Sequence, residues 1–79
     1  MNQLIAEARE LMEFHSTGLP ATNPKVAELT AELIKDAESG APRDEVMQDI
    51  LDLLEIIKGG TAEKRIRPLY DALLAQSSA

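Results

Sequence analysis

The chain has 79 residues and a net charge of −6 at pH 7, with no cysteine, no Trp, one Tyr and one Phe. This length suits one domain, the missing thiols exclude disulfide scaffolds and thiolate metal sites, and the excess of carboxylates opposes direct binding to nucleic acid. No stretch approaches the roughly 20 apolar residues of a membrane span, and the start lacks the pattern of a secretory signal, so we expect a cytoplasmic protein without membrane contacts.

Glycine and proline divide the chain into helical segments. Gly18, Gly40 and Gly59 stand where a helix ends in a left-handed residue, and Pro24 and Pro42 fall in first helical turns. The expected helices cover about residues 2–16, 24–38, 42–58 and 61–76, and residues 77–79 form a frayed tail. We therefore predict that residues 1–79 form one all-α domain. In this small antiparallel four-helix domain, the first helix packs across the other three.

The first segment is amphipathic, and its apolar stripe ends in His15. As the only histidine, His15 lacks a second ligand or a nucleophile, so we interpret it as a packing residue. Phe14 falls off the stripe and projects between Glu7 and Glu10. An apolar anchor with a polar rim is typical of a protein interface, whereas the alternative is burial by another helix of the same chain.

The second segment is amphipathic and is followed by Ser39. In length, acidity and helix content the chain resembles acyl carrier proteins, in which a serine carries phosphopantetheine, and Ser39 would be that residue. The run Glu38-Ser39-Gly40 departs from the Asp-Ser-Leu-like turn of carrier proteins, and a strong helix replaces the long loop expected before it. A carrier domain therefore remains a minor alternative.

The third segment has the widest apolar arc, which extends out to Met47 and Leu51. We expect it to be the central helix and to contact two neighbours. Its opposite face carries three carboxylates at positions i, i+4 and i+7, namely Glu45, Asp49 and Asp52.

Three carboxylates on one face can bind a hard cation, but the required motifs are missing. Counting from Asp36, the chain has Ala41 and Met47 where a calcium loop has glycine and glutamate. The chain also lacks the Glu-x-x-His pair of di-metal helical bundles. We therefore predict a solvated acidic face without a metal ion.

Ile56 projects among these three carboxylates, off the apolar arc of its helix. Like Phe14, it is predicted to be an apolar anchor with a charged rim. The alternative is again that another helix of the chain covers this face.

The connection Lys58-Gly59-Gly60-Thr61 precedes the fourth segment. It lacks the spacing of a phosphate-binding P-loop, so we interpret it as a helix end followed by Thr61 as the next N-cap. The basic residues of this region can bind an acidic partner or neutralise Glu63 and Asp71 locally. They are Lys58, Lys64, Arg65 and Arg67.

No residue pattern supplies a nucleophile with a base, a metal shell, a phosphate cradle or a basic nucleic-acid face. We therefore predict a non-enzymatic regulator or inhibitor that needs no cofactor and binds another protein. Among such roles we favour an antiactivator that occludes a transcriptional regulator or a similar basic-surfaced partner. The alternative is a structural homodimer, in which the same anchors bury against an identical chain. The predicted partner-binding residues are Phe14, Glu45, Asp49, Asp52 and Ile56.

Overall fold

The structure is a computed structural model that describes residues 2–77, with the side chains of residues 2–76. Its four helices are α1 (Asn2–His15), α2 (Pro24–Ser39), α3 (Arg43–Ile57) and α4 (Thr61–Ser77). The predicted all-α, four-helix fold is therefore confirmed, and each end differs from its expected position by at most one residue. Of the tail predicted at 77–79, Ser77 ends α4, while residues 78 and 79 lie outside the described residues.

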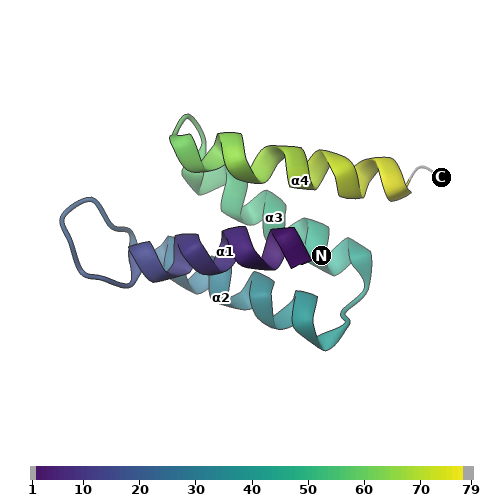
Figure 1. The fold of residues 1–79 in the computed structure, drawn as a ribbon, viewed down its shortest axis with the longest axis horizontal. Helices are drawn as coiled ribbons and strands as arrows, with labels where there is room; N and C mark the ends of the chain where they lie inside the picture. The colour runs from purple at the N-terminus through teal and green to yellow at the C-terminus, as the bar shows by residue number, and fades with distance from the viewer. Residues whose placement is uncertain (1, 78–79) are drawn as a thin grey trace.

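The helices form a bundle in which each one contacts two others. α1 contacts α2 and α4, and α3 also contacts α2 and α4, so α1 and α3 lie diagonally opposite. The prediction that the third helix contacts two neighbours is confirmed. Successive helices run in alternating directions in Figure 1, consistent with the expected antiparallel arrangement. α1 lies alongside α2 and completes the bundle instead of crossing it, because an apolar face of each helix is available to the other (Figure 1).

The ends of α2 follow from local capping. Asn23 precedes the helix with an extended backbone, and its side-chain oxygen accepts a hydrogen bond from the Lys25 N–H at 2.9 Å. Pro24 occupies the first turn, where its missing N–H leaves no helical carbonyl unpaired. At the other end Gly40 has φ 77°, a left-handed conformation that side chains disfavour, and its N–H donates to the Asp36 carbonyl.

One apolar core holds the described residues together, and α3 is central to it. Six of the thirteen buried apolar residues belong to α3, because its wide apolar arc is covered by α2 on one side and α4 on the other. The buried hydroxyl of Thr30 donates to the Val26 carbonyl at 2.8 Å, so it lies in the core with a partner. The thirteen are Leu4, Ala8, Val26, Leu33, Ile34, Val46, Met47, Ile50, Leu53, Leu54, Ile57, Ile66 and Leu73.

Candidate functional site

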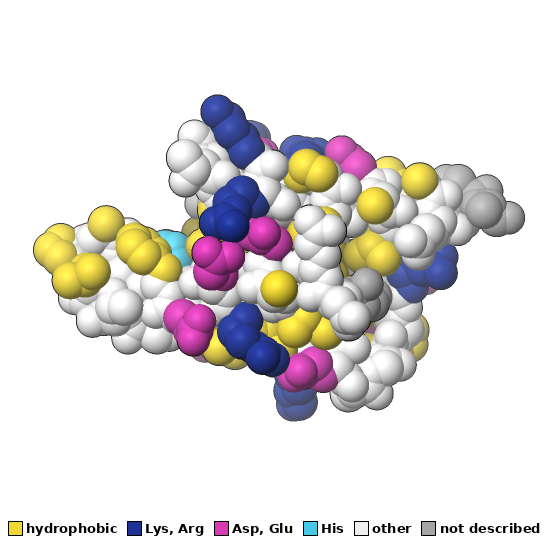
Figure 2. Space-filling model, in the orientation of Figure 1, with side chains coloured by type: hydrophobic (Ala, Val, Ile, Leu, Met, Phe, Trp, Pro, Cys, Tyr) yellow, Lys and Arg dark blue, Asp and Glu magenta, His cyan; other side chains and the backbone are white. Residues whose placement is uncertain are grey.

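The ion pairs of the described residues join α1, α2 and α4, and none of them includes a residue of α3. On the face shown in Figure 2, basic and acidic side chains stand side by side. Arg65 reaches across to α1, and Arg67 pairs with Glu63 within α4. Local neutralisation, one of the two alternatives left open for these basic residues, is therefore seen for Glu63. The nitrogen–oxygen distances are 3.2 Å for Arg9–Glu38, 3.0 Å for Arg65–Glu7, 3.1 Å for Arg65–Glu10 and 3.6 Å for Arg67–Glu63.

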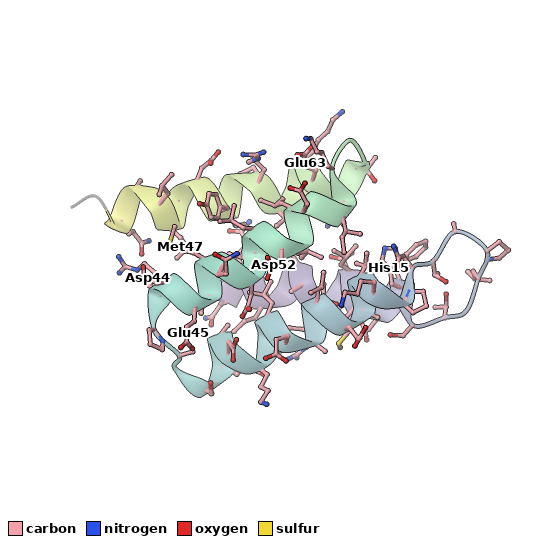
Figure 3. All side chains as sticks on the ribbon, turned by 180° about the vertical axis from the view of Figure 1, so that it is seen from behind. His15, Asp44, Glu45, Met47, Asp52 and Glu63 are labelled. Carbon is pink, nitrogen blue, oxygen red and sulfur yellow. The ribbon has the colours of Figure 1, made fainter. Side chains whose placement is uncertain are left out.

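α3 carries five carboxylates on the side opposite its buried residues. Asp44, Glu45, Asp52 and Glu55 are exposed, and Asp49 is half-buried. Placing successive residues about 100° apart puts all five on one arc of the helix. Figure 3 shows Asp44, Glu45 and Asp52 along this helix from behind. We call these five residues the α3 acidic face.

Two exposed apolar side chains accompany the α3 acidic face, Ile56 within its arc and Leu51 at one edge. Ile56 is 39% exposed, so the predicted anchor is at the surface and is not covered by another helix of the described chain. Leu51, at the edge of the face, is 40% exposed. The expectation that Leu51 belongs to the buried arc is wrong. Around the helix, the buried side of α3 ends at Met47, and Leu51 lies just beyond this edge. The position of Leu51 beside Asp44 and Glu55 on the helical wheel is the sequence signal for its exposure.

Asp49 lies at the edge of this face, toward α2. Burial raises its pKa from 3.8 to about 7, together with a hydrogen bond and negative charge from Asp36 and the charges of Glu32 and Asp52. Its Oδ2 atom is buried and has no hydrogen-bond partner among the described residues. A partly buried carboxyl group that interacts with a second acidic side chain is stabilised when it carries a proton. Asp49 and Asp36 therefore form an acidic contact between α3 and α2 whose charge changes near neutral pH.

The carboxylates of α3 share a face without converging on one point. Within the described part of the chain, no three His, Cys, Asp or Glu residues are arranged to hold a metal ion. Glu45, Asp49 and Asp52 are successive turns apart, so their oxygens are spread along the helix. This spacing gives an extended charged surface instead of a single point of convergence.

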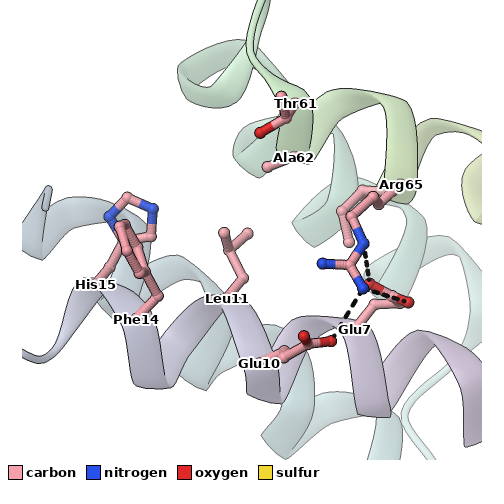
Figure 4. Close-up of a pocket in the computed structure, with 9 residues that line it drawn as sticks. Glu7, Glu10, Leu11, Phe14, His15, Thr61, Ala62 and Arg65 are labelled. Atoms are coloured by element: carbon pink, nitrogen blue, oxygen red, sulfur yellow. Dashed lines mark hydrogen bonds and ion pairs between the residues drawn. The ribbon is translucent and has the colours of Figure 1, made fainter. Parts of the chain in front are cut away.

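Phe14 lies at a different place, in a pocket of about 310 Å³ between α1 and α4. Phe14 is 47% exposed, and its ring meets the His15 ring edge-on, with centroids 5.0 Å apart. The predicted neighbours Glu7 and Glu10 line the same pocket, where both pair with Arg65 (Figure 4). We call this pocket the α1–α4 groove. Its main apolar lining comes from Leu11, Phe14, Ala62 and Ile66.

His15 has a structural partner of the kind expected from the sequence. The backbone N–H of Asn23 donates to its Nδ1 at 2.9 Å, which ties the end of α1 to the residue that caps α2. The neighbouring Ser16 hydroxyl donates instead to the Met12 carbonyl at 2.7 Å. The two side chains therefore do not form a nucleophile–base pair.

The predicted partner-binding residues fall on two separate surfaces. Glu45, Asp49, Asp52 and Ile56 share α3, whereas Phe14 belongs to the α1–α4 groove, and α1 and α3 do not contact each other. The sequence pattern left their relative position open, because it assigns residues to a face of their own helix and not to a position in the bundle.

Ser39, the residue considered for phosphopantetheine, ends α2, and its hydroxyl donates to the Asp36 carbonyl at 3.2 Å.

Among the described residues, no helix has the length and apolar character needed to cross a membrane. No protein-family model, curated protein or solved structure matches the chain.

Proposed function

We propose that the protein is a non-enzymatic inhibitor that covers a basic surface of another protein, and in particular an antiactivator of a DNA-binding regulator. The observation that supports this proposal is the α3 acidic face. Its five carboxylates form no ion pair within the described residues, and two exposed apolar side chains, Ile56 and Leu51, lie among them and beside them. The contrast with the other helices is informative, because α1, α2 and α4 each pair some of their charges.

The unpaired carboxylates supply attraction for a basic partner. Crowded like charges repel one another, and cationic side chains of a partner would relieve that repulsion on contact. The attraction acts over about 8 Å at physiological ionic strength, so it accelerates association and weakens when salt is added. The DNA-binding surface of a regulator has the required positive charge, since it binds phosphates. A protein that covers this surface would prevent the regulator from binding DNA.

Ile56 and Leu51 supply the apolar part of the contact. Each is about two-fifths exposed, and complete burial of such a side chain is worth about 1.5–3 kcal/mol. Covering the remaining exposed part of each would therefore contribute about 1 kcal/mol. Two such anchors beside a charged rim match the usual anatomy of a specific interface.

The experiment is capture of partners from the lysate of the native host at low and high salt, with wild-type protein beside variants. Ile56→Asp removes an anchor while making the face more acidic, so charge attraction alone would strengthen its binding. Leu74→Asp is the matched control, because Leu74 is 46% exposed on α4.

We expect a basic protein that is captured at low salt by the wild type and by Leu74→Asp, but not by Ile56→Asp. A partner that is retained equally by all three proteins at both salt concentrations would overturn the proposal. Loss of DNA binding by the captured regulator, measured with the purified proteins, then tests the antiactivator role itself.

A further inference from the structure

The loop between α1 and α2 ends in an exposed apolar tip. Leu19 is 56% exposed, and it is followed by exposed Pro20 and Ala21. Hydrophobic side chains gather on this protruding end of the molecule, at the left of Figure 2. The tip is held by its own hydrogen bonds, since both the N–H and the hydroxyl of Thr22 donate to the Leu19 carbonyl, at 2.9 and 2.6 Å. An apolar side chain on a fixed turn loses little entropy when it binds.

The α1–α4 groove lies next to this tip and is large enough to accept it. Phe14 belongs to both, since it lines the groove and stands where α1 leads into the loop. The groove has a volume of about 310 Å³, and a cavity of about 150 Å³ already holds benzene. Leu11, Ala62 and Ile66 provide an apolar floor for an incoming aliphatic side chain.

The charge of the chain is distributed so that this side can meet a second copy. By their residues, α1 carries −2 and α4 carries +1, which gives −1 together, whereas α2 carries −2 and α3 carries −4, which gives −6; Lys58 adds the last positive charge. In the groove, Arg65 pairs with both Glu7 and Glu10, which leaves this cluster with one net negative charge. Two copies joined through α1 and α4 would therefore keep their acidic faces outward and apart.

We propose that the protein forms a homodimer in which each chain inserts Leu19 into the α1–α4 groove of the other. The chain itself carries both halves of the contact, an apolar projection and an apolar pocket side by side on one face. A two-fold axis between them makes each contact twice, as in the symmetric interfaces of most homodimers. A stable interface covers about 800 Å² per partner, which is roughly a sixth of the 4963 Å² exposed by this chain. The dimer would present two α3 acidic faces on its outer sides.

The absence of cysteine allows a direct test by disulfide crosslinking. Leu19→Cys and Ala62→Cys proteins are mixed under mild oxidation, and mass spectrometry identifies the mixed dimer. Leu19→Cys mixed with Leu74→Cys is the matched control, because Leu74 lies far along α4 from the groove. We expect the 19–62 crosslink to form and the 19–74 crosslink to be absent or much slower. Equal rates for the two pairs would overturn the proposed interface.

Sedimentation equilibrium over a range of protein concentrations gives the second readout. We expect wild type and Leu74→Asp to be dimers at high concentration and Leu19→Asp to be a monomer. Because Leu19 lies outside the core, Leu19→Asp should keep the helical circular dichroism of the wild type, so a monomer would not reflect unfolding. The proposal would be overturned if the wild type stayed monomeric at every concentration. It would also be overturned if the Leu19→Asp variant dimerised as the wild type does.

Discussion

Replacing Asp49 by Asn should stabilise the protein at neutral and alkaline pH. In the folded chain the pKa of Asp49 is raised from 3.8 to about 7, chiefly by burial and by Asp36. The folded state therefore binds more protons than the unfolded state between these two values. It follows that the contribution of Asp49 to the free energy of unfolding falls as pH rises from about 4 to about 7 and stays low above that range.

The magnitude follows from the size of this shift. A rise from 3.8 to about 7, at about 1.4 kcal/mol per unit, sets a ceiling of about 4 kcal/mol. Asp49 is only half-buried, so solvent screens part of the repulsion, and we expect about 1–2 kcal/mol. Asparagine keeps the shape of the side chain, carries no charge, and offers an N–H donor to the Asp36 carboxylate.

The assay is urea unfolding of wild type and Asp49→Asn at about pH 5 and about pH 8, below and above the raised pKa. Because pH 5 already lies above the ordinary pKa of 3.8, we expect the variant to exceed the wild type slightly at the lower pH and by clearly more at the higher pH. Asp71→Asn, at an exposed position within α4, is the control and should change little at either pH. An Asp49→Asn variant that is less stable than wild type at the higher pH, or equally changed at both, would refute the reasoning.

The other predictions concern the core and the helix ends, and urea unfolding measures each of them. Ile50→Ala should lower the free energy of unfolding by about 2–5 kcal/mol, because Ile50 is 0% exposed at the centre of the core; a loss below about 1 kcal/mol would contradict that placement. Asn23→Ala should cost about 1 kcal/mol through loss of the α2 cap, and an unchanged midpoint would show that the cap is unimportant. Gly40→Ala should destabilise by more than Gly60→Ala, because only Gly40 has the positive φ of 77°; the reverse order would contradict the assigned helix end.

The helices were predictable because the positions of glycine and proline and the period of the apolar residues indicate the same helix ends. Gly18, Gly40 and Gly59 all have positive φ, as their positions after apolar stripes predict. Thr61 was expected to be an N-cap, but α4 begins at Thr61 itself, and the Glu63 carboxylate accepts a hydrogen bond from the Gly59 N–H at 3.2 Å. Local side-chain hydrogen bonds can move the start of a helix by one residue, and the spacing of apolar residues does not predict such a small change.

The candidate site was only partly predictable. Phe14 and Ile56 are exposed, as their positions off the apolar stripes suggest, but the pattern cannot show that they belong to different surfaces. The approach of Asp36 to Asp49 depends on how α2 and α3 are aligned against each other. That alignment comes from packing between helices, on which the periodicity within each helix carries no information.

The proposed function makes a specific claim, that the position of the α3 carboxylates and not the net charge of the chain governs binding. Two triple variants with the same net charge separate these effects. One neutralises exposed residues of the α3 acidic face, and the other neutralises exposed carboxylates elsewhere that form no ion pair. The first combines Glu45→Gln, Asp52→Asn and Glu55→Gln, and the second combines Glu13→Gln, Glu28→Gln and Asp71→Asn.

The decisive measurement is the affinity of these variants and of the wild type for the captured partner, as a function of salt concentration. We predict that the variant of the α3 acidic face binds more weakly and with a shallower salt dependence, while the second variant binds as the wild type does. Equal weakening of both variants, or a wild-type affinity that does not change with salt, would contradict the proposed function.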